Sequence, residues 1–278
     1  MLKRITIFLM ISLLAGCYDT ELVFEDQYRA VVEAYLYVDK EITNIKISSM
    51  ISFGIDSTGG ESIADAGITL ERGDQVWSLV HNPSDPGTYY LDNSPVLVPG
   101  DTIRLRVELE EEILTAETLI PGNPPSVSMS ASSIGIPRVE SMMDFRNIEM
   151  PDPVDLTWDN PGANYYFFNI QNIESNPEAI MPDPPEDFPF AKGGFAFQMI
   201  TRPTNDNYYS ISTRELTHFG THRIVITSVN DEYVNLYNSQ DQDSRELNEP
   251  YTNIENGLGI FTAFNSDTLY LEVFPVYN

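Results

Sequence analysis

The stretch Thr102-Ile-Arg-Leu-Arg-Val-Glu-Leu109 decides the fold class of this chain. Apolar residues stand at every second position, and Thr, Arg and Glu fill the positions between them. Successive side chains of a strand point to opposite faces, so this pattern predicts a strand with one buried face. A helix would instead need apolar residues at every third or fourth position.

The same two-residue period recurs before and after that stretch. Residues 30–38 place Ala, Val, Ala, Leu and Val on one face, and residues 113–120 form another such run that ends at Pro121. Turn residues such as Gly73-Asp74 separate the runs. Several short strands with turns between them predict a β-sandwich over residues 29–121.

The second half of the chain predicts another sandwich. Residues 122–133 are rich in Pro and Ser and indicate a linker. Strand patterns resume within residues 134–278, so we expect a C-terminal sandwich there. Residues 174–192 combine prolines and acids, and we interpret them as an insertion because prolines at that density cannot donate to a strand ladder.

The end of the chain is expected to hold one short helix and two strands. Residues 231–239 place Tyr and Leu at helical spacing, which indicates one or two turns. Residues 256–264 and 268–274 then predict two final strands. We expect the sequence Asn265-Ser-Asp267 to form the turn between them.

Composition excludes some function classes. The 278 residues include 42 acidic and 15 basic side chains, which gives a formal net charge of −27. Because such a chain repels phosphates, we expect no nucleic acid among its partners. Cys17 is the single cysteine, so neither an intrachain disulfide nor a cysteine metal cluster can form.

The N-terminus has the features of a secretory signal. Lys3 and Arg4 are positive, residues 5–14 are apolar, and Ala15 and Gly16 are small. This order is typical of a signal peptide, and the apolar run is too short for a stable membrane span. We therefore assign residues 1–16 to a signal that is removed.

The tetrapeptide Leu14-Ala-Gly-Cys17 resembles a bacterial lipobox. The resemblance implies cleavage before Cys17 and its acylation, with palmitate among the expected chains, and several acyl chains suffice for stable anchoring. Residues 17–28 would then form an acidic tether. Tyr18 follows the cysteine, so retention at the inner membrane is not indicated. The acids beyond Cys17 resemble the export signal of surface lipoproteins in Bacteroidetes, which favours display at the cell surface over a periplasm-facing anchor.

Both sandwiches resemble known folds. The succession Ala66–Leu70, Gly87–Leu91 and Ile103–Val107 resembles a transthyretin-like or carboxypeptidase-regulatory-like sandwich. Residues 154–171 and 216–230 resemble strands of a fibronectin type III domain, whose core tryptophan would be Trp158 here. The fold class that we predict is therefore all-β, with two tandem sandwiches.

The tail from Glu249 to Phe261 carries the most specific resemblance. With Asn253, Gly257, Gly259 and Phe261, it is similar to the end of the Bacteroidetes lipoproteins of domain-of-unknown-function family 4249. That family has no assigned activity, and its members are often encoded near TonB-dependent outer-membrane transporters. The resemblance implies a non-catalytic accessory role at the outer membrane, with such a transporter as partner. The alternative is a stand-alone glycan- or protein-binding or adhesion module.

Candidate catalytic and metal-binding groups are weak in this sequence. His218 and His222 have a spacing that binds Zn²⁺ on a helix, but on a strand they would stand about 13 Å apart. Two acidic clusters could hold Ca²⁺, although a solvated acidic surface is the favoured interpretation. They are Asp183, Glu186 and Asp187, and Asp241, Asp243 and Glu246. The chain has no nucleophile elbow or phosphate loop, so we predict no enzyme activity, no metal and no cofactor.

Aromatic residues provide the candidate partner contacts. Phe188 and Phe190 are flanked by prolines and acids, which makes them the better surface candidates among the aromatic residues, although packing back onto the sandwich is still favoured. Tyr251 and Phe261 in the tail complete the predicted partner-binding set. Residues 165–168, also aromatic, are expected to be mostly core.

Overall fold

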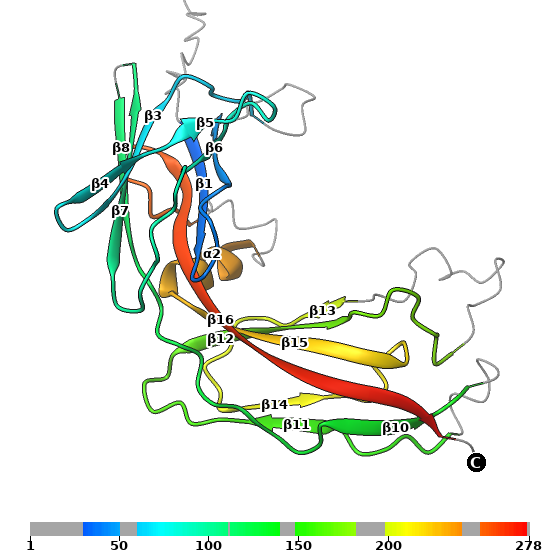
Figure 1. The fold of residues 1–278 in the computed structure, drawn as a ribbon. Coiled ribbons are helices and arrows are strands. Elements are labelled where there is room, and N and C mark those ends of the chain that lie inside the picture. Colours follow the sequence, from blue (N-terminus) through cyan, green and yellow to red (C-terminus); the bar gives the residue numbers. More distant parts are fainter. Residues whose placement is uncertain are drawn as a thin grey trace, which may run out of the picture.

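The computed structural model describes residues 30–50, 60–110, 112–139, 148–181, 198–240 and 251–276. Within these ranges the chain is built of strands with a single helix (Figure 1). The alternating pattern gives the expected half-buried strands: in β7 (Thr102–Leu109), Ile103, Leu105 and Val107 are buried while the residues between them are more exposed. The prediction of an all-β sandwich fold is confirmed.

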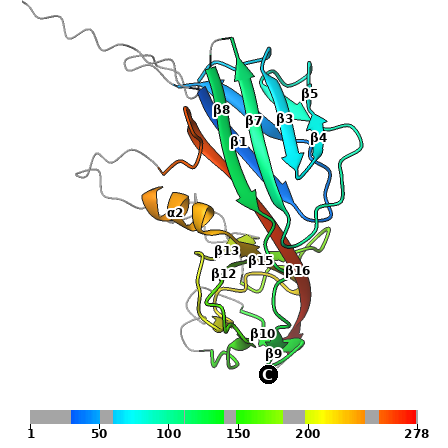
Figure 2. The ribbon, with the colours of Figure 1, turned by 90° about the vertical axis from the view of Figure 1, so that its left-hand side faces the viewer.

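The N-terminal sandwich packs two sheets face to face. One sheet orders its strands as β16, β1, β2, β6 and β5, and the other as β4, β3, β7 and β8. Their bounds are β1 Ala30–Tyr37, β2 Ile45–Ser49, β3 Gly67–Arg72, β4 Gln75–Ser78, β5 Val80–His81, β6 Thr88–Tyr90, β8 Glu112–Leu119 and β16 Leu258–Val276. Figure 2 shows the four-stranded sheet in front of β1. Apolar side chains such as Val32, Leu70 and Leu114 fill the space between the sheets.

The C-terminal sandwich is also two-layered. Its larger sheet runs β13, β12, β15, β16, with β10 beside β16, and its smaller sheet runs β14, β11, β9. Their bounds are β9 Ser128–Met129, β10 Ser133–Pro137, β11 Val154–Thr157, β12 Tyr165–Asn172, β13 Gln198–Ile200, β14 Tyr208–Ile211 and β15 Gly220–Val229. Trp158 is buried here between the layers and contacts Phe168, as expected of a core tryptophan.

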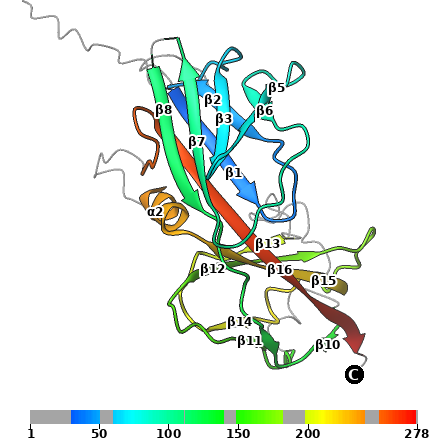
Figure 3. The same ribbon diagram turned by 60° about the vertical axis from the view of Figure 1, so that its left-hand side comes forward.

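The final strand β16 crosses from one sandwich into the other (Figure 3). Residues 258–264 pair in parallel with β1, and residues 265–273 pair antiparallel with β15. The predicted turn at Asn265-Ser-Asp267 is therefore wrong. The chain stays extended there because β15 takes over the backbone pairing where β1 ends, and the Asn265 amide is used for a tertiary contact, donating to the carbonyl of Pro121 over 3.1 Å.

This crossing corrects the predicted domain boundaries. Ile254, Phe261 and Ala263 belong to the core of the N-terminal sandwich, although they lie in the sequence range predicted for the C-terminal one. The predicted linker is also partly structured, since β9 lies within it and pairs with β11. The two sandwiches thus share a strand and are not consecutive segments.

The spacing at residues 231–239 predicts a short helix, and the structure has the helix α2 (Asp231–Gln240) there. This helix lies where the two sandwiches meet. Tyr233 packs edge-on against Phe264 of β16, with ring centroids 5.0 Å apart. At the helix start, the Asn230 amide donates to the carbonyl of Leu119 over 2.7 Å. The helix therefore fastens the C-terminal chain to β8 of the N-terminal sandwich. In the part of the chain that the structure describes, no helix has the length and apolarity to cross a membrane.

Candidate functional site

The tail motif around Asn253 closes the chain onto the N-terminal sandwich. The side-chain amide of Asn253 donates to the carbonyl of Phe261 over 2.8 Å, and its oxygen accepts from the Phe261 amide over 2.9 Å. The side chain thus imitates a neighbouring strand and satisfies both backbone groups of a fully buried residue. These contacts hold the loop before β16 against the strand.

The two motif glycines are needed because backbone and side chains approach them closely. Gly259 has a φ of +104°, and a Cβ there would collide with the carbonyl of Val32 on β1. A Cβ on Gly257 would collide with the Leu114 side chain and lie 3.1 Å from the carbonyl of Ala30. Only glycine lacks the Cβ that would collide at both positions, and at Gly259 only glycine adopts the positive φ without strain.

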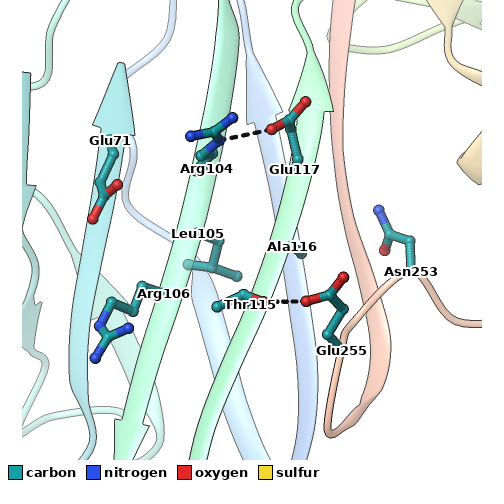
Figure 4. Close-up of a pocket in the computed structure, with 9 residues that line it drawn as sticks. All are labelled: Glu71, Arg104, Leu105, Arg106, Thr115, Ala116, Glu117, Asn253 and Glu255. Carbon is teal, nitrogen blue, oxygen red and sulfur yellow. Dashed lines mark hydrogen bonds and ion pairs between the residues drawn. The ribbon is translucent and has the colours of Figure 1, made fainter. Parts of the chain in front are cut away.

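The loop that carries Asn253 forms one wall of an open pocket of about 480 Å³ (Figure 4). At its edge the loop pairs with β8: the amide of Glu255 donates to the carbonyl of Thr115 over 2.8 Å. The pocket lies over β7 and β8. Its lining consists of Glu71, Arg104, Leu105, Arg106, Thr115, Ala116, Glu117, Asn253 and Glu255.

Charged side chains from three strands cross the pocket in a row. Glu71, Arg104 and Glu117 occupy directly opposite positions on β3, β7 and β8. The Arg104 Nε donates to Glu117 Oε2 over 2.7 Å. The hydrogen bond and charge of Glu117, together with the charge of Glu71, raise the pKa of Arg104 above its usual value. Thr115 Oγ1 donates to Glu255 Oε2 over 2.8 Å at the far side.

This arrangement suits binding of a charged or polar group from solution. The Arg104 side chain is 68% exposed and that of Glu117 is 54% exposed, so water screens their attraction. Such a pair can exchange partners at little cost: the guanidinium can donate to a carboxylate of a ligand, and the released glutamate can accept from an amine. The pocket therefore has the chemistry to contact a zwitterionic ligand or the mixed charges of a protein surface.

The structure corrects one predicted partner contact. Phe261 is 0% exposed in the N-terminal core, so the prediction that it touches a partner is wrong. The place of Phe261 in the tail motif is explained by its packing against β1 and by its hydrogen bonds to Asn253. Tyr251 is half-buried, and its amide donates to Ser239 Oγ over 3.2 Å; its partner role stays a prediction. Cys17, Phe188 and Phe190 lie outside the described residues.

The two histidines are part of the C-terminal sandwich. His222 points into the core from β15, and its Nδ1 lies 3.1 Å from the carbonyl of Gly220. Burial lowers its pKa, against an opposing effect of the Gly220 carbonyl, and the nearby His218 lowers it further. His218 is also buried, with its Nδ1 2.8 Å from the Thr217 hydroxyl. These contacts fit the interpretation as strand and turn residues.

Two acidic clusters are candidate Ca²⁺ sites in the sequence, which nevertheless predicts no metal. The clusters at residues 183–187 and 241–246 fall outside the described residues. Among the residues that are described, no group of three or more His, Cys, Asp or Glu side chains is placed to hold a metal ion.

Sequence reasoning did not single out Arg104, Glu117 or Glu255 as site residues. On their own strands they resemble ordinary solvated positions, and only the register of β3, β7 and β8 aligns them. Glu255 lies beside them because the loop before β16 pairs with the edge of β8, although the two segments are more than a hundred residues apart in the sequence. The one usable signal was the pair of arginines at positions 104 and 106 in a strongly acidic chain.

Fold and site together define an all-β protein of two sandwiches joined by a shared strand, with an open charged pocket beside its closing loop. The chain belongs to the family described as Domain of unknown function (DUF4249), whose model matches residues 18–269. The matched range includes the N-terminal sandwich, the whole tail motif and the C-terminal sandwich except the last residues of β16. None of the curated proteins with which the chain was compared matches it.

Proposed function

We propose that this chain is a non-catalytic lipoprotein, anchored in the outer membrane through Cys17 and displayed at the cell surface, where it serves as an accessory to a TonB-dependent transporter or nutrient-uptake complex. Two observations support the anchor. The charged, apolar and small-residue segments of a signal lead directly to the single cysteine. The family match then begins at the next residue, Tyr18.

The observation that carries the accessory role is the direction of β1. Val31 pairs with Leu258 and Tyr37 with Phe264, after which β16 continues into the C-terminal sandwich. Strand β1 therefore begins at the end of its sandwich that lies away from the C-terminal sandwich (Figure 3). The chain from Cys17 to Ala30, with twelve residues between them, spans at most about 47 Å. An anchor at Cys17 would thus keep the N-terminal sandwich near the membrane.

This orientation also gives the charged pocket a role. The pocket lies on β7 and β8 of the sandwich nearer the anchor, where a membrane-embedded transporter can reach it. Its arginines and glutamates suit complementary charges on such a partner. The C-terminal sandwich would extend away from the membrane.

The anchor is tested by replacing Cys17 with Ser. We expect the variant to lose palmitate labelling and to leave the membrane fraction, because the thiol is the predicted acylation site. Thr20→Ser is the matched control, which changes the same segment and keeps the cysteine. A Cys17→Ser protein that is still acylated and sediments with membranes would refute the anchor.

The partner is tested by affinity purification of a C-terminally tagged chain from outer membranes in mild detergent. We expect a β-barrel transporter in stoichiometric amount with the wild type. Arg104→Ala should reduce its recovery several-fold, whereas Lys46→Ala, which removes an exposed charge on the other sheet, should not. Recovery of the lipoprotein alone would contradict the accessory role.

The size and lining of the pocket favour a second candidate, a stand-alone binding module. A volume of about 480 Å³ with polar groups on three sides lies in the range of small-molecule sites. In that case the wild type would bind its ligand without a transporter, and Arg104→Ala would abolish that binding.

A further inference from the structure

The outer face of the larger C-terminal sheet carries an ordered set of polar and aromatic side chains. Strand register places Gln171, Arg223 and Tyr270 side by side on β12, β15 and β16. Two residues further along these strands, on the same face, Thr221 lies beside Glu272. The alternation of these strands sends the neighbouring residues His222 and Leu271 into the core, so the five named side chains share the solvent face.

Hydrogen bonds hold the polar groups of this face in place. Arg223 Nη2 donates to Gln171 Oε1 over 3.0 Å, and Thr221 Oγ1 donates to Glu272 Oε2 over 3.0 Å. A guanidinium has five N–H donors, and the bond to Gln171 uses one of them. The face therefore presents fixed donors and acceptors side by side, which is what adjacent hydroxyl groups require.

Two aromatic rings of β16 lie on this face, one on each side of Glu272. Tyr270 is 56% exposed and Phe274 is 42% exposed. Phe274 lies across Gly135 of β10, where a Cβ would come within 2.9 Å of the ring, so the glycine lets the ring rest against the sheet. The two residues are four apart on one strand, about 13 Å, with Glu272 between them. An extended ligand could therefore contact both rings.

We propose that this face binds a neutral oligosaccharide or polysaccharide. Sugar rings offer apolar faces that pack on aromatic side chains, and their hydroxyl groups both donate and accept hydrogen bonds. The charges of Arg223 and Glu272 offset each other, and Glu174, which accepts from the Thr221 amide over 2.9 Å, adds a further negative charge at this end of the face. The whole chain has a net charge of −27, so the surrounding field disfavours an anionic polymer. A neutral sugar chain is not repelled by this field.

A protein partner fits this face less well. The centre of a protein interface is depleted in charged residues and rich in buried apolar anchors. Here Glu272 lies between the two rings on β16, and Arg223 and Thr221 lie beside them on β15. This arrangement, with charged and polar groups between and beside the aromatic rings, differs from an interface core. It suits a ligand that is polar along its length.

The test uses the full chain with Cys17→Ser, so that it does not depend on the proposed anchor or transporter. Migration would be compared in native gels that contain starch, β-glucan, mannan, xylan or galactan, with polygalacturonate as the anionic polymer. We expect at least one neutral polysaccharide to slow the chain. Tyr270→Ala and Arg223→Ala should each weaken that binding on the order of tenfold, since each removes a ring contact or a charged hydrogen bond.

Tyr208→Ala is the matched control, because Tyr208 is 47% exposed on β14 of the opposite sheet. It should bind like the wild type, and unfolding curves would show that all variants are folded. The proposal is overturned if no neutral polysaccharide slows the chain, if only polygalacturonate does, or if folded Tyr270→Ala and Arg223→Ala chains bind as well as the wild type. Loss of transporter recovery would leave it unaffected.

Discussion

At the scale of single residues, Asn253 shows how one side chain can hold a loop against a strand. Its amide group bonds both backbone groups of Phe261, in the way that a strand would. Aspartate could accept but could not donate, and alanine could do neither. The residue type follows from the need to satisfy a buried donor and a buried acceptor at once.

We predict that Asn253→Ala lowers the free energy of unfolding by about 1–3 kcal/mol, because it leaves two buried backbone groups unpaired. Denaturant unfolding followed by fluorescence would measure the change. Asn169→Ala is the control, since that side chain bonds Gln198 on the exposed face; we expect a change within about 0.5 kcal/mol. Equal effects of the two substitutions would show that the Phe261 bonds contribute little.

Gly259→Ala should be more severe. A φ of +104° costs a residue with a side chain about 1–3 kcal/mol, and collision with the Val32 carbonyl adds to this. We therefore expect a loss of about 3 kcal/mol or a chain that no longer folds, measured by the same unfolding curves. Gly122→Ala, where a Cβ meets no atom within 4 Å, should leave stability nearly unchanged. A stable Gly259→Ala chain would mean that β1 and β16 can separate without cost.

At the scale of elements, β15 shows how the core accommodates a titratable side chain. His222 lies on the same face as Ile224 and Ile226, within the C-terminal core. The titratable groups near it are His218, Glu174 and Glu272. The carboxylates raise its pKa, but burial outweighs them, so the folded chain prefers the neutral imidazole.

This preference predicts a loss of stability on mild acidification. The unfolded histidine has a pKa of about 6.5. As the pH falls below that value, the unfolded state binds a proton that folded His222 does not, so the free energy of unfolding decreases until the folded pKa is reached. Unfolding curves between pH 7.5 and 5 would show this slope, and His222→Gln should flatten it. An unchanged slope in the variant would assign the pH dependence to other groups.

At the scale of the whole molecule, β16 makes the two sandwiches depend on each other. Its first part supplies Phe261 and Ala263 to the N-terminal core, and its second part supplies Leu271 and Val273 to the C-terminal core. Helix α2 adds bonds from Asn230 and Glu232 to β8. Neither sandwich can unfold without removing a strand from the other.

We therefore predict that both sandwiches unfold in one transition. The chain has two tryptophans, Trp77 against the N-terminal core and Trp158 within the C-terminal core. In Trp158→Phe and Trp77→Phe chains, the remaining tryptophan reports one sandwich by its fluorescence. Within each variant, the fluorescence curve should coincide with the unfolding curve from circular dichroism. Separate transitions within one variant would show that the shared strand does not couple them.

Local patterns predicted much of this architecture. The alternation at residues 102–109 gave a strand with the correct face buried, and the helical spacing at residues 231–239 gave α2. Such patterns succeed because burial acts on each element separately. The candidate pocket was not predicted, because the row of Glu71, Arg104 and Glu117 exists only once three strands are in register.

The sequence by itself determined the all-β class, the strong negative charge and the family membership that the family match confirms. Only the tertiary structure decided that Asn265-Ser-Asp267 is extended and that Phe261 is core. The physical reason is the same in both cases. A turn signal and an aromatic side chain express local preferences, and pairing of β16 with β1 and then with β15 satisfies more backbone hydrogen bonds than a turn could.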